Sequence, residues 1–363
     1  HKGADQRWLS GLAAGNLRGG AVWRCGIDRL MRVLVTGGTG FLGGRCLQAL
    51  ASSGRFDASA TGRRLSSAPA GFDFIAADLS EPGALARLPA VDAVVHTAAL
   101  SSPWGRAQDF DQANVVATRN LLEWAEQAGV QRLIHISTPA LYFAPFDRFD
   151  VGEEEVLPGK PINDYARTKA QAENLVLQSP LSTAILRPRA IYGPGDTALL
   201  PRLEAALRRG WLPLMRDGQA VTNLTHVDDV CDAIVAALEG SAQGGFNIAW
   251  GEAIPLNWLV NEIARANSLA FRWQTVPLPI AMLAARGTEA VFTGLRLPSE
   301  PRLTRYSLGI FAYSLTLNTK RAQEVLGWRP RILIADGFEA IFGVRPEALP
   351  THRRADDGKE QAS

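Results

Sequence analysis

The chain has 363 residues, of which 47% are hydrophobic and 20% are charged, and its formal net charge is +2. This composition is typical of a globular protein with a sizeable core. A charge so close to neutral, without a basic run interleaved with aromatic residues, argues against nucleic acid as a partner.

The cysteines and histidines predict no metal site. The three cysteines have no CxxC spacing and an odd count, which argues against a disulfide framework and indicates a reducing, cytoplasmic setting. No two histidines are three or four residues apart, so no helix would present a pair of ligands on one face. We expect His96, His135 and His226, which lie in apolar runs, to be structural.

The two ends of the chain are expected to lie outside the folded part. Residues 1–30 show no convincing secretory signal, because the apolar run at residues 9–14 is short and is interrupted by Ser10 and Gly11. We therefore expect residues 1–30 to be a disordered leader. Residues 346–363 are expected to form a disordered tail, since residues 351–363 are polar and charged.

The first clear motif is at residues 31–43, which read MRVLVTGGTGFLG. A short strand turns directly into a glycine-rich bend and then into a helix expected over residues 42–53. Gly37 permits the tight turn, Gly40 lets the backbone approach phosphate, and Gly43 lets the helix pack closely on the strand. Because N–H groups at a helix N-terminus bind anions, the motif predicts a dinucleotide-binding site.

Strand-like and helical patterns alternate after this motif. Strand-like runs recur at residues 57–61, 73–77, 93–96 and 132–136. Several are almost continuously apolar, as in strands that are buried on both faces of a parallel sheet. The alternation predicts βαβ units, so we expect residues 31–180 to form the main part of a doubly wound α/β Rossmann sheet.

The pattern changes beyond residue 180. A strand-like run at residues 183–186 leads into Arg187 and Pro188, and the alternation then becomes irregular. We expect residues 181–345 to complete the sheet and to form a smaller substrate lobe. Ligands of open α/β sheets bind at the carboxyl ends of the strands where the winding reverses, so the cleft between the two parts is the expected site.

The end of the second strand indicates the cofactor. Residues 60–64 read ATGRR, so Arg63 and Arg64 follow the strand and no carboxylate does. An acidic residue there would bind the ribose 2′-hydroxyl of NAD, whereas arginine accommodates a 2′-phosphate. The sequence therefore favours NADP over NAD; the alternative is that both arginines are solvated loop charges.

Tyr165 and Lys169 are four residues apart, which places them on the same face of a helix. A cation beside a phenol favours the phenolate and lowers the pKa of the tyrosine from about 10. Such a tyrosine can exchange a proton with a hydroxyl or carbonyl oxygen while hydride moves to or from a cofactor. Thr138, just after the run at residues 132–136, can hydrogen-bond the same oxygen.

The glycine motif, Thr138 and the Tyr165/Lys169 pair, in this order, resemble the extended short-chain dehydrogenase/reductase family, also called the NAD-dependent epimerase/dehydratase family. The resemblance runs from about residue 31 to about residue 345. It implies hydride transfer between nicotinamide and a secondary alcohol or ketone, with Tyr165 as the proton donor. It also implies cofactor contacts at Gly37, Gly40, Phe41, Leu42, Gly43, Asp78, Leu79, Thr97, Ala98, Ala99, Tyr165, Lys169 and Pro188.

The resemblance implies more particular roles for some of these residues. Asp78 would meet the adenine, Pro188 would lie beside the nicotinamide, and Asn114 would steady the central sheet, often through water. The alternatives are that Asp78 caps the following helix and that Asn114 is a turn or cap residue. Thr138 matches the family's catalytic hydroxyl, and Ser137 is the alternative.

Other motifs concern the substrate. Sugar-nucleotide members carry an arginine that pairs with substrate phosphate, but Thr222 and Asn223 stand in the corresponding stretch. Residues 101–104 (SSPW), 137–139 (STP) and 303–306 (LTRY) resemble the 3β-hydroxysteroid dehydrogenase-like branch. That branch implies an apolar substrate of the steroid, 3-oxo acid or flavanonol type. Candidate side chains for an apolar pocket are Trp104, Phe110, Phe143, Phe146, Trp211, Met282 and Phe292.

Two other functions stay open, namely a sugar-nucleotide epimerase or dehydratase and a non-catalytic NADP-binding sensor or scaffold. The family resemblance also implies a homodimer, because helices that match residues 110–128 and 161–177 pair across the interface in relatives. The apolar stretch at residues 276–297 is interrupted by Arg286 and Glu289, which argues against a spanning helix. It predicts a helix that covers an apolar substrate or lies on a membrane surface.

Overall fold

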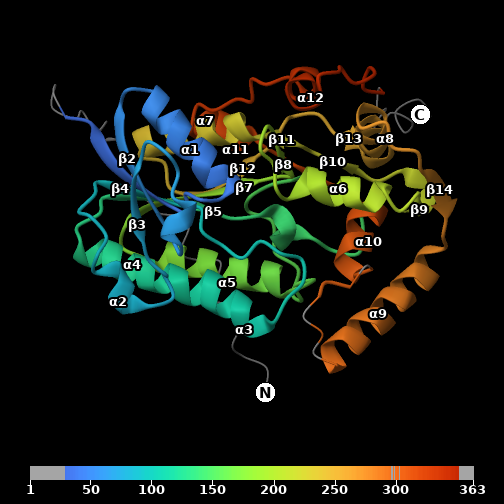
Figure 1. Ribbon diagram of the computed structural model, residues 1–363, viewed down its shortest axis with the longest axis horizontal. Helices are drawn as coiled ribbons and strands as arrows, with labels where there is room; N and C mark the ends of the chain where they lie inside the picture. The colour runs from blue at the N-terminus through green and yellow to red at the C-terminus, as the bar shows by residue number, and fades with distance from the viewer. Residues whose placement is uncertain (1–28, 296, 298, 302, 351–363) are drawn as a thin grey trace, which may run out of the picture.

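A computed structural model describes residues 29–295, 297, 299–301 and 303–350 (Figure 1). Residues 1–28 and 351–363, which hold nearly all of the predicted leader and most of the predicted tail, lie outside the described residues.

One seven-stranded sheet forms the centre of the structure, and all neighbouring strands in it are parallel. Its strands are β1 (Met31–Thr36), β2 (Phe56–Gly62), β3 (Asp73–Ala76), β4 (Ala93–His96), β5 (Arg132–Ile136), β7 (Ser182–Pro188) and β12 (Gly244–Ile248). They are arranged in the order β12-β7-β5-β4-β1-β2-β3, so the winding reverses between β1 and β4. This order confirms the predicted doubly wound sheet.

Helices cover both faces of this sheet. They include α1 (Phe41–Ser52), α2 (Pro82–Leu85), α4 (Ala117–Gln127), α5 (Asp164–Gln178) and α7 (Val227–Glu239). Val33 and Val35 of β1 belong to the core under α1 and α7, whereas Leu34 belongs to the core under α4 and α5. Figure 1 shows α1 and α7 on one side and α2, α4 and α5 on the other. The apolar run of β1 is explained by burial of both its faces.

A smaller lobe lies beside the sheet and has its own core, in which Leu200, Ile263 and Phe338 are buried. Its helices are α6 (Leu199–Leu207), α8 (Leu256–Ala266), α9 (Leu278–Gly294), α10 (Arg305–Ala312), α11 (Lys320–Val325) and α12 (Ile334–Phe342). Its short strands are β8 (Ile191–Tyr192), β9 (Trp211–Leu214), β10 (Val221–Thr222), β11 (Thr225–His226), β13 (Ile254–Pro255), β14 (Arg272–Thr275) and β15 (Leu315–Leu317).

The two parts of the chain are interleaved. Strand β6 (Arg148–Val151) precedes residue 180 yet pairs with β15, while β7 and β12 complete the central sheet from the second half. The short helices η1 (Leu65–Ser67), η3 (Pro139–Tyr142) and η4 (Arg216–Gly218) are of the 3-10 type. The helix expected over residues 110–128 consists of three consecutive segments. They are the end of α3 (Ala107–Phe110), the π-helix η2 (Asp111–Val116) and α4.

The apolar stretch at residues 276–297 forms α9, which buries Ala281 and Ala285 and exposes Ile280, Leu283 and Val291. Figure 1 shows α9, in orange, at the margin of the structure next to α10. Among the described residues, no helix is both long and apolar enough to cross a membrane. Contact of α9 with a membrane surface and a cytoplasmic location stay predictions.

A buried ion pair joins α5 to β7. Arg187 donates from Nε to Oε1 of Glu173 at 2.9 Å and from Nη2 to Oε2 at 2.6 Å, and both side chains are buried. Such a two-pronged pair satisfies both charges away from water. It fixes α5, which carries Tyr165 and Lys169, against the sheet.

Removal of one partner of this pair should therefore destabilise the fold. We expect Glu173→Ala to lower the free energy of unfolding by about 3–5 kcal/mol, because Arg187 is left charged and buried. Glu204→Ala is the control, since Glu204 forms only a 3.9 Å ion pair with the exposed Arg208. Equal effects of the two substitutions in urea unfolding would show that the buried pair does not fix α5.

Candidate active site

The glycine motif forms a turn that leaves no room for side chains. Gly37 has a φ of +70°, and a Cβ there would lie 2.8 Å from Cα of Ala98. A Cβ at Gly43 would collide with the carbonyl of Gly37. Helix α1 begins after Gly40, no side chain caps it, and its first turn holds no acidic residue. Its first N–H groups are therefore suited to a phosphate, and the site fits a dinucleotide.

The end of β4 is tied to this turn. Oγ1 of Thr97 donates to the carbonyl of Thr36 at 2.6 Å, and the N–H of Ala98 donates to Oγ1 of Thr36 at 3.3 Å. These bonds hold Thr97, Ala98 and the following Ala99 beside Gly37. The structure thus brings together the residues that the sequence predicted on both sides of the point where the winding reverses.

The residues predicted for the adenosine end follow β2 and β3. Arg63 and Arg64 follow β2, are exposed, and form no ion pair with another residue in the described part of the chain. Asp78 accepts from the N–H of Ser80 at 2.9 Å and from its hydroxyl at 2.7 Å, so it shapes the turn after β3. The cap of α2 is Glu81, so Asp78 does not cap that helix. Leu79 is buried.

Asn114 lies in the π-helix and links three elements. Its Oδ1 accepts from the N–H of Leu100 at 2.7 Å, and its Nδ2 donates to Oγ1 of Thr168 at 3.0 Å. The bonds are direct, so Asn114 joins the chain after β4 to helix α5. The π-helix places the carboxamide between them, and irregular turns of this kind are frequent at functional sites.

Thr138 and Tyr165 are brought together at the end of β5. Thr138 caps η3 by accepting from the N–H of Ala140 at 3.2 Å, and η3 packs against α5, which carries Tyr165. Burial raises the pKa of Tyr165 to about 12, although the nearby hydroxyl of Thr138 lowers it in part. The hydroxyl of Ser137 is buried and has no hydrogen-bond partner in the described part of the chain. Thr138, rather than Ser137, is thus the hydroxyl beside Tyr165.

Lys169 lies differently from the sequence expectation. Its ammonium donates to the carbonyl of Ile136 at 2.6 Å and lies 3.2 Å from Nε2 of His135. Burial lowers the pKa of Lys169 to about 8, while Glu173 raises it in part. In this structure the pKa of Tyr165 is raised rather than lowered, because β5 holds the ammonium and burial of the phenol dominates.

His135 is a site residue that the sequence interpretation treated only as structural. It lies opposite His96 in the parallel register of β4 and β5, with ring centroids 5.2 Å apart. His96 is satisfied by Thr36 and Thr118 at 2.8 and 3.0 Å, as expected for a structural histidine. Burial lowers the pKa of His135 further than the charge of Lys169 does, so the imidazole is neutral and accepts from Lys169. The contact between His135 and Lys169 could be predicted only from the register of β4 and β5, which the sequence does not reveal.

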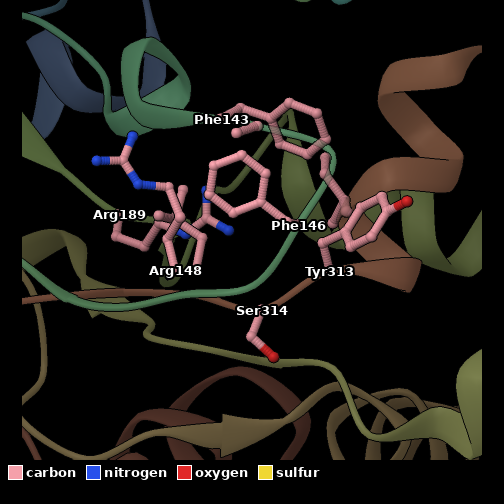
Figure 2. Close-up of a pocket in the computed structure, with 9 residues that line it drawn as sticks. Phe143, Phe146, Arg148, Arg189, Tyr313 and Ser314 are labelled. Atoms are coloured by element: carbon pink, nitrogen blue, oxygen red, sulfur yellow. The ribbon is translucent and has the colours of Figure 1, made fainter. Parts of the chain in front are cut away.

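A cleft lies directly after η3 (Figure 2), and its side chains pack so closely that it holds no free volume for a water-sized group. The cleft is lined by Phe143, Ala144, Phe146, Arg148, Arg189, Ile310, Tyr313, Ser314 and Leu315. Two of the predicted pocket residues, Phe143 and Phe146, are therefore part of it. The other predicted residues do not line it, namely the buried Phe110, the exposed Trp211, Met282, and Trp104, whose ring meets that of Phe292 edge to face.

The side chains of Thr222 and Asn223 form hydrogen bonds within the protein, with a neighbouring arginine and with backbone carbonyls. Asn223 donates from Nδ2 to the carbonyls of Trp250 and Glu252, both at 3.0 Å. Thr222 accepts from Nε of Arg189 at 3.0 Å. Arg189 follows Pro188 directly, and the sequence interpretation did not single it out.

The lowered pKa of Lys169 gives the folded protein a specific pH dependence. Above pH 8 and below the ordinary lysine pKa of 10.5, the unfolded chain binds more protons at this position than the folded one. The free energy of unfolding of the wild type, relative to Lys169→Met, should therefore rise by up to about 3 kcal/mol as the pH increases through this range. Lys320→Met, at an exposed lysine, is the control. A constant difference between wild type and Lys169→Met would contradict the pKa.

Comparison with known proteins identifies the family of the chain. A family model described as the NAD dependent epimerase/dehydratase family matches residues 33–249. The chain is 35% identical to the uncharacterized protein YbjS of Escherichia coli (strain K12), covering 85% of this chain and 96% of that protein. It is 32% identical to 2-alkyl-3-oxoalkanoate reductase of Stenotrophomonas maltophilia (strain K279a), covering 86% and 98%.

More distant similarities point to the same family. Sterol-4-alpha-carboxylate 3-dehydrogenase, decarboxylating, of Schizosaccharomyces pombe is 27% identical, covering 83% of this chain and 94% of that protein. The crystal structure of DesIV, a dTDP-glucose 4,6-dehydratase from Streptomyces venezuelae with NAD bound, has a TM-score of 0.68 at 27% identity, covering 86% and 96%. The chain belongs to the NAD dependent epimerase/dehydratase family, with relatives named as reductases and dehydrogenases, and is an oxidoreductase acting on CH–OH groups.

Proposed function

We propose that this protein is an NADP-preferring reductase of a ketone on an apolar substrate, of the steroid, 3-oxo acid or flavanonol type. The observation that carries the proposal is the packing of α5 against η3 and the end of β5, which brings Tyr165 beside Thr138. The pair lies on the same edge of the sheet as the glycine turn, and an aromatic cleft begins at Phe143, after η3.

The chain's own groups suit proton transfer in the direction of reduction. The bound nicotinamide supplies the hydride. Because burial raises the pKa of Tyr165 to about 12, its phenol is protonated at neutral pH and can donate to the oxygen of the reacting carbonyl. Thr138, whose hydroxyl lies near this phenol, orients the same oxygen. Lys169 binds the carbonyl of Ile136 at the end of β5 and so fixes one side of α5, and Asn114 fixes another through Thr168.

The cofactor preference rests on Arg63 and Arg64. Both are exposed directly after β2, at the position where a dinucleotide's ribose is bound in this fold. Since forked guanidinium donors match phosphate, two arginines without an acidic neighbour favour a 2′-phosphate.

The substrate preference rests on the lobe. Thr222 and Asn223, which replace the phosphate-binding residues of sugar-nucleotide members, are engaged with Arg189 and backbone carbonyls. The cleft side chains are mainly aromatic or aliphatic, which favours an apolar substrate. The relative named 2-alkyl-3-oxoalkanoate reductase supports a ketone substrate of this kind.

Two rival functions give different results in one assay. NADPH oxidation is followed with a panel of steroids, 3-oxo acids, flavanonols and UDP-sugars. Steady consumption with a ketone supports the reductase, whereas conversion of a UDP-sugar without net consumption indicates an epimerase. Cofactor binding without turnover of any member indicates a non-catalytic NADP-binding protein.

We also propose that the protein forms a homodimer through α4 and α5. The two helices lie side by side on one face of the sheet, and Leu177 at the end of α5 is 54% exposed. A four-helix interface between two copies would cover such apolar side chains.

Loss of the phenolic hydroxyl should abolish turnover. We expect Tyr165→Phe to reduce kcat with the best ketone of the panel by several orders of magnitude, because the proton donor is removed while the cofactor site is intact. Cofactor affinity should be unchanged in fluorescence titration. Tyr192→Phe is the control, since that buried hydroxyl lacks a partner among the described residues. Near-normal turnover by Tyr165→Phe would overturn the mechanism.

The cofactor assignment is tested separately. Arg63→Ala combined with Arg64→Ala should weaken NADPH binding at least tenfold and leave NADH binding nearly unchanged, because only NADPH has the 2′-phosphate. Calorimetric titration measures both affinities, and Arg87→Ala at another exposed arginine is the control. An unchanged ratio of the two affinities would assign Arg63 and Arg64 as solvated loop charges.

A further inference from the structure

Arg189 has a fixed position in the substrate lobe. Its backbone N–H donates to the carbonyl of Ile248 at 3.0 Å, and its Nε donates to Oγ1 of Thr222 at 3.0 Å. The side chain is partly buried and lines the cleft that Figure 2 shows. The guanidinium is thus held by β10 in the wall of the cleft, unlike a mobile surface cation.

Arg189 also differs from nearby arginines in its charge balance. Arg187 is paired with Glu173, and Arg148, in the same cleft, is paired with Glu155. Among the described residues, no carboxylate forms an ion pair with Arg189. Burial lowers the pKa of Arg189, and the phenol of the nearby Tyr306 raises it only in part. Because a partly buried cation is costly without an anion, the position favours an anionic ligand group.

The surroundings of Arg189 are otherwise mainly apolar. Figure 2 shows the ring of Phe146 beside Arg148 and Arg189, with the rings of Phe143 and Tyr313 farther from the two arginines. Phe146 is 59% exposed, so a ligand that enters this closed space can displace its ring toward solvent at little cost in buried area. A ligand with an acidic group for Arg189 and an apolar chain for the aromatic side chains would match both parts of the cleft.

Arg189 lies at the same edge of the sheet as the proposed reacting centre. It directly follows β7, which pairs in parallel with β5, and Thr138 lies just after β5. The ring of Tyr306 packs against Phe143, which lines the cleft together with Arg189, with centroids 5.8 Å apart. The cleft therefore adjoins the end of β5, where we propose that Thr138 and Tyr165 act.

We propose that Arg189, positioned by Thr222, binds a carboxylate of the substrate, so that the enzyme prefers oxo acids with an apolar chain to neutral ketones. This inference rests on the proposed ketone reductase function. It adds a specificity-determining residue outside the glycine turn and the Tyr165 helix. The carbonyl of such a substrate would lie at Tyr165 while its carboxylate lies at Arg189.

A carboxylate fits better than a sugar-nucleotide diphosphate. A diphosphate carries more charge than one guanidinium balances, and the other cation that lines the cleft, Arg148, is already paired with Glu155. Phe143 and Ile310 also present no donors to a sugar. The charge and the polarity of the cleft therefore favour an apolar carboxylate over a sugar nucleotide.

The test compares 3-oxodecanoate with its methyl ester. In the wild type, kcat/KM should be at least tenfold higher for the acid. Arg189→Met should lower kcat/KM for the acid at least about 30-fold, since the buried carboxylate loses its partner, and should change the value for the ester less than about threefold. Arg189→Lys should retain part of the acid preference. Arg208→Met, at the exposed residue that caps the C-terminus of α6, should leave kcat/KM for both substrates unchanged.

Binding of decanoate gives a second readout that needs no turnover. Calorimetry in the presence of NADP should show decanoate binding to the wild type and at least tenfold weaker binding to Arg189→Met. Equal losses for acid and ester, unchanged decanoate binding, or tighter binding of UDP-glucose than of decanoate would each overturn the role of Arg189. Failure of the proposed function is distinct: decanoate binding would still depend on Arg189, but neither acid nor ester would be reduced by the wild type.

Discussion

The close approach of α1 to the end of β1 is the constraint on which the rest of the site depends. It requires that no side chain stand at Gly37 or Gly43, because the space is filled by Ala98 and by the carbonyl of Gly37 itself. With α1 in this place, its uncapped N-terminus points to the edge where β1 and β4 end. The ends of β5 and β7 lie along the same edge of the sheet, and this places Thr138 and Pro188 there.

The buried charges of this region follow a consistent pattern. The charge of Arg187 is balanced by Glu173, and that of Lys169 is shared between a strand-end carbonyl and the neutral His135. Arg189 differs from both, since a hydroxyl is its side-chain partner in the described structure. Charges that serve the fold are paired within it, whereas a charge in a cleft without a counter-ion is available to a ligand.

Much of the fold is readable from local patterns, because strands buried on both faces give continuous apolar runs such as those of β1 and β4. Strand β12 was not predicted, since its two leading glycines resemble a loop and its pairing with β7 is set by long-range contacts. The π-helix was not predicted either. Its irregularity is fixed by the bonds of Asn114 to Leu100 and Thr168, which no periodicity reveals.

The candidate site shows the same division. Spacing on one helix placed Tyr165 and Lys169 on adjacent turns, and the order of motifs placed Thr138 beside them. Spacing did not reveal that Lys169 points to His135, because that pairing depends on the register of β4 and β5. It also did not reveal Arg189, whose proposed role rests on the lack of an ion-pair partner among the described residues and not on any motif.

The central claim is that the glycine turn and the Tyr165 helix serve net hydride transfer to a ketone. NADPH carrying deuterium at both C4 positions of its nicotinamide, incubated with the protein and an apolar ketone, tests it directly. Mass spectrometry of the product should show one deuterium on the carbinol carbon, in amounts equal to the NADPH oxidised. Alcohol without deuterium, or oxidation of NADPH without labelled alcohol, would contradict the account.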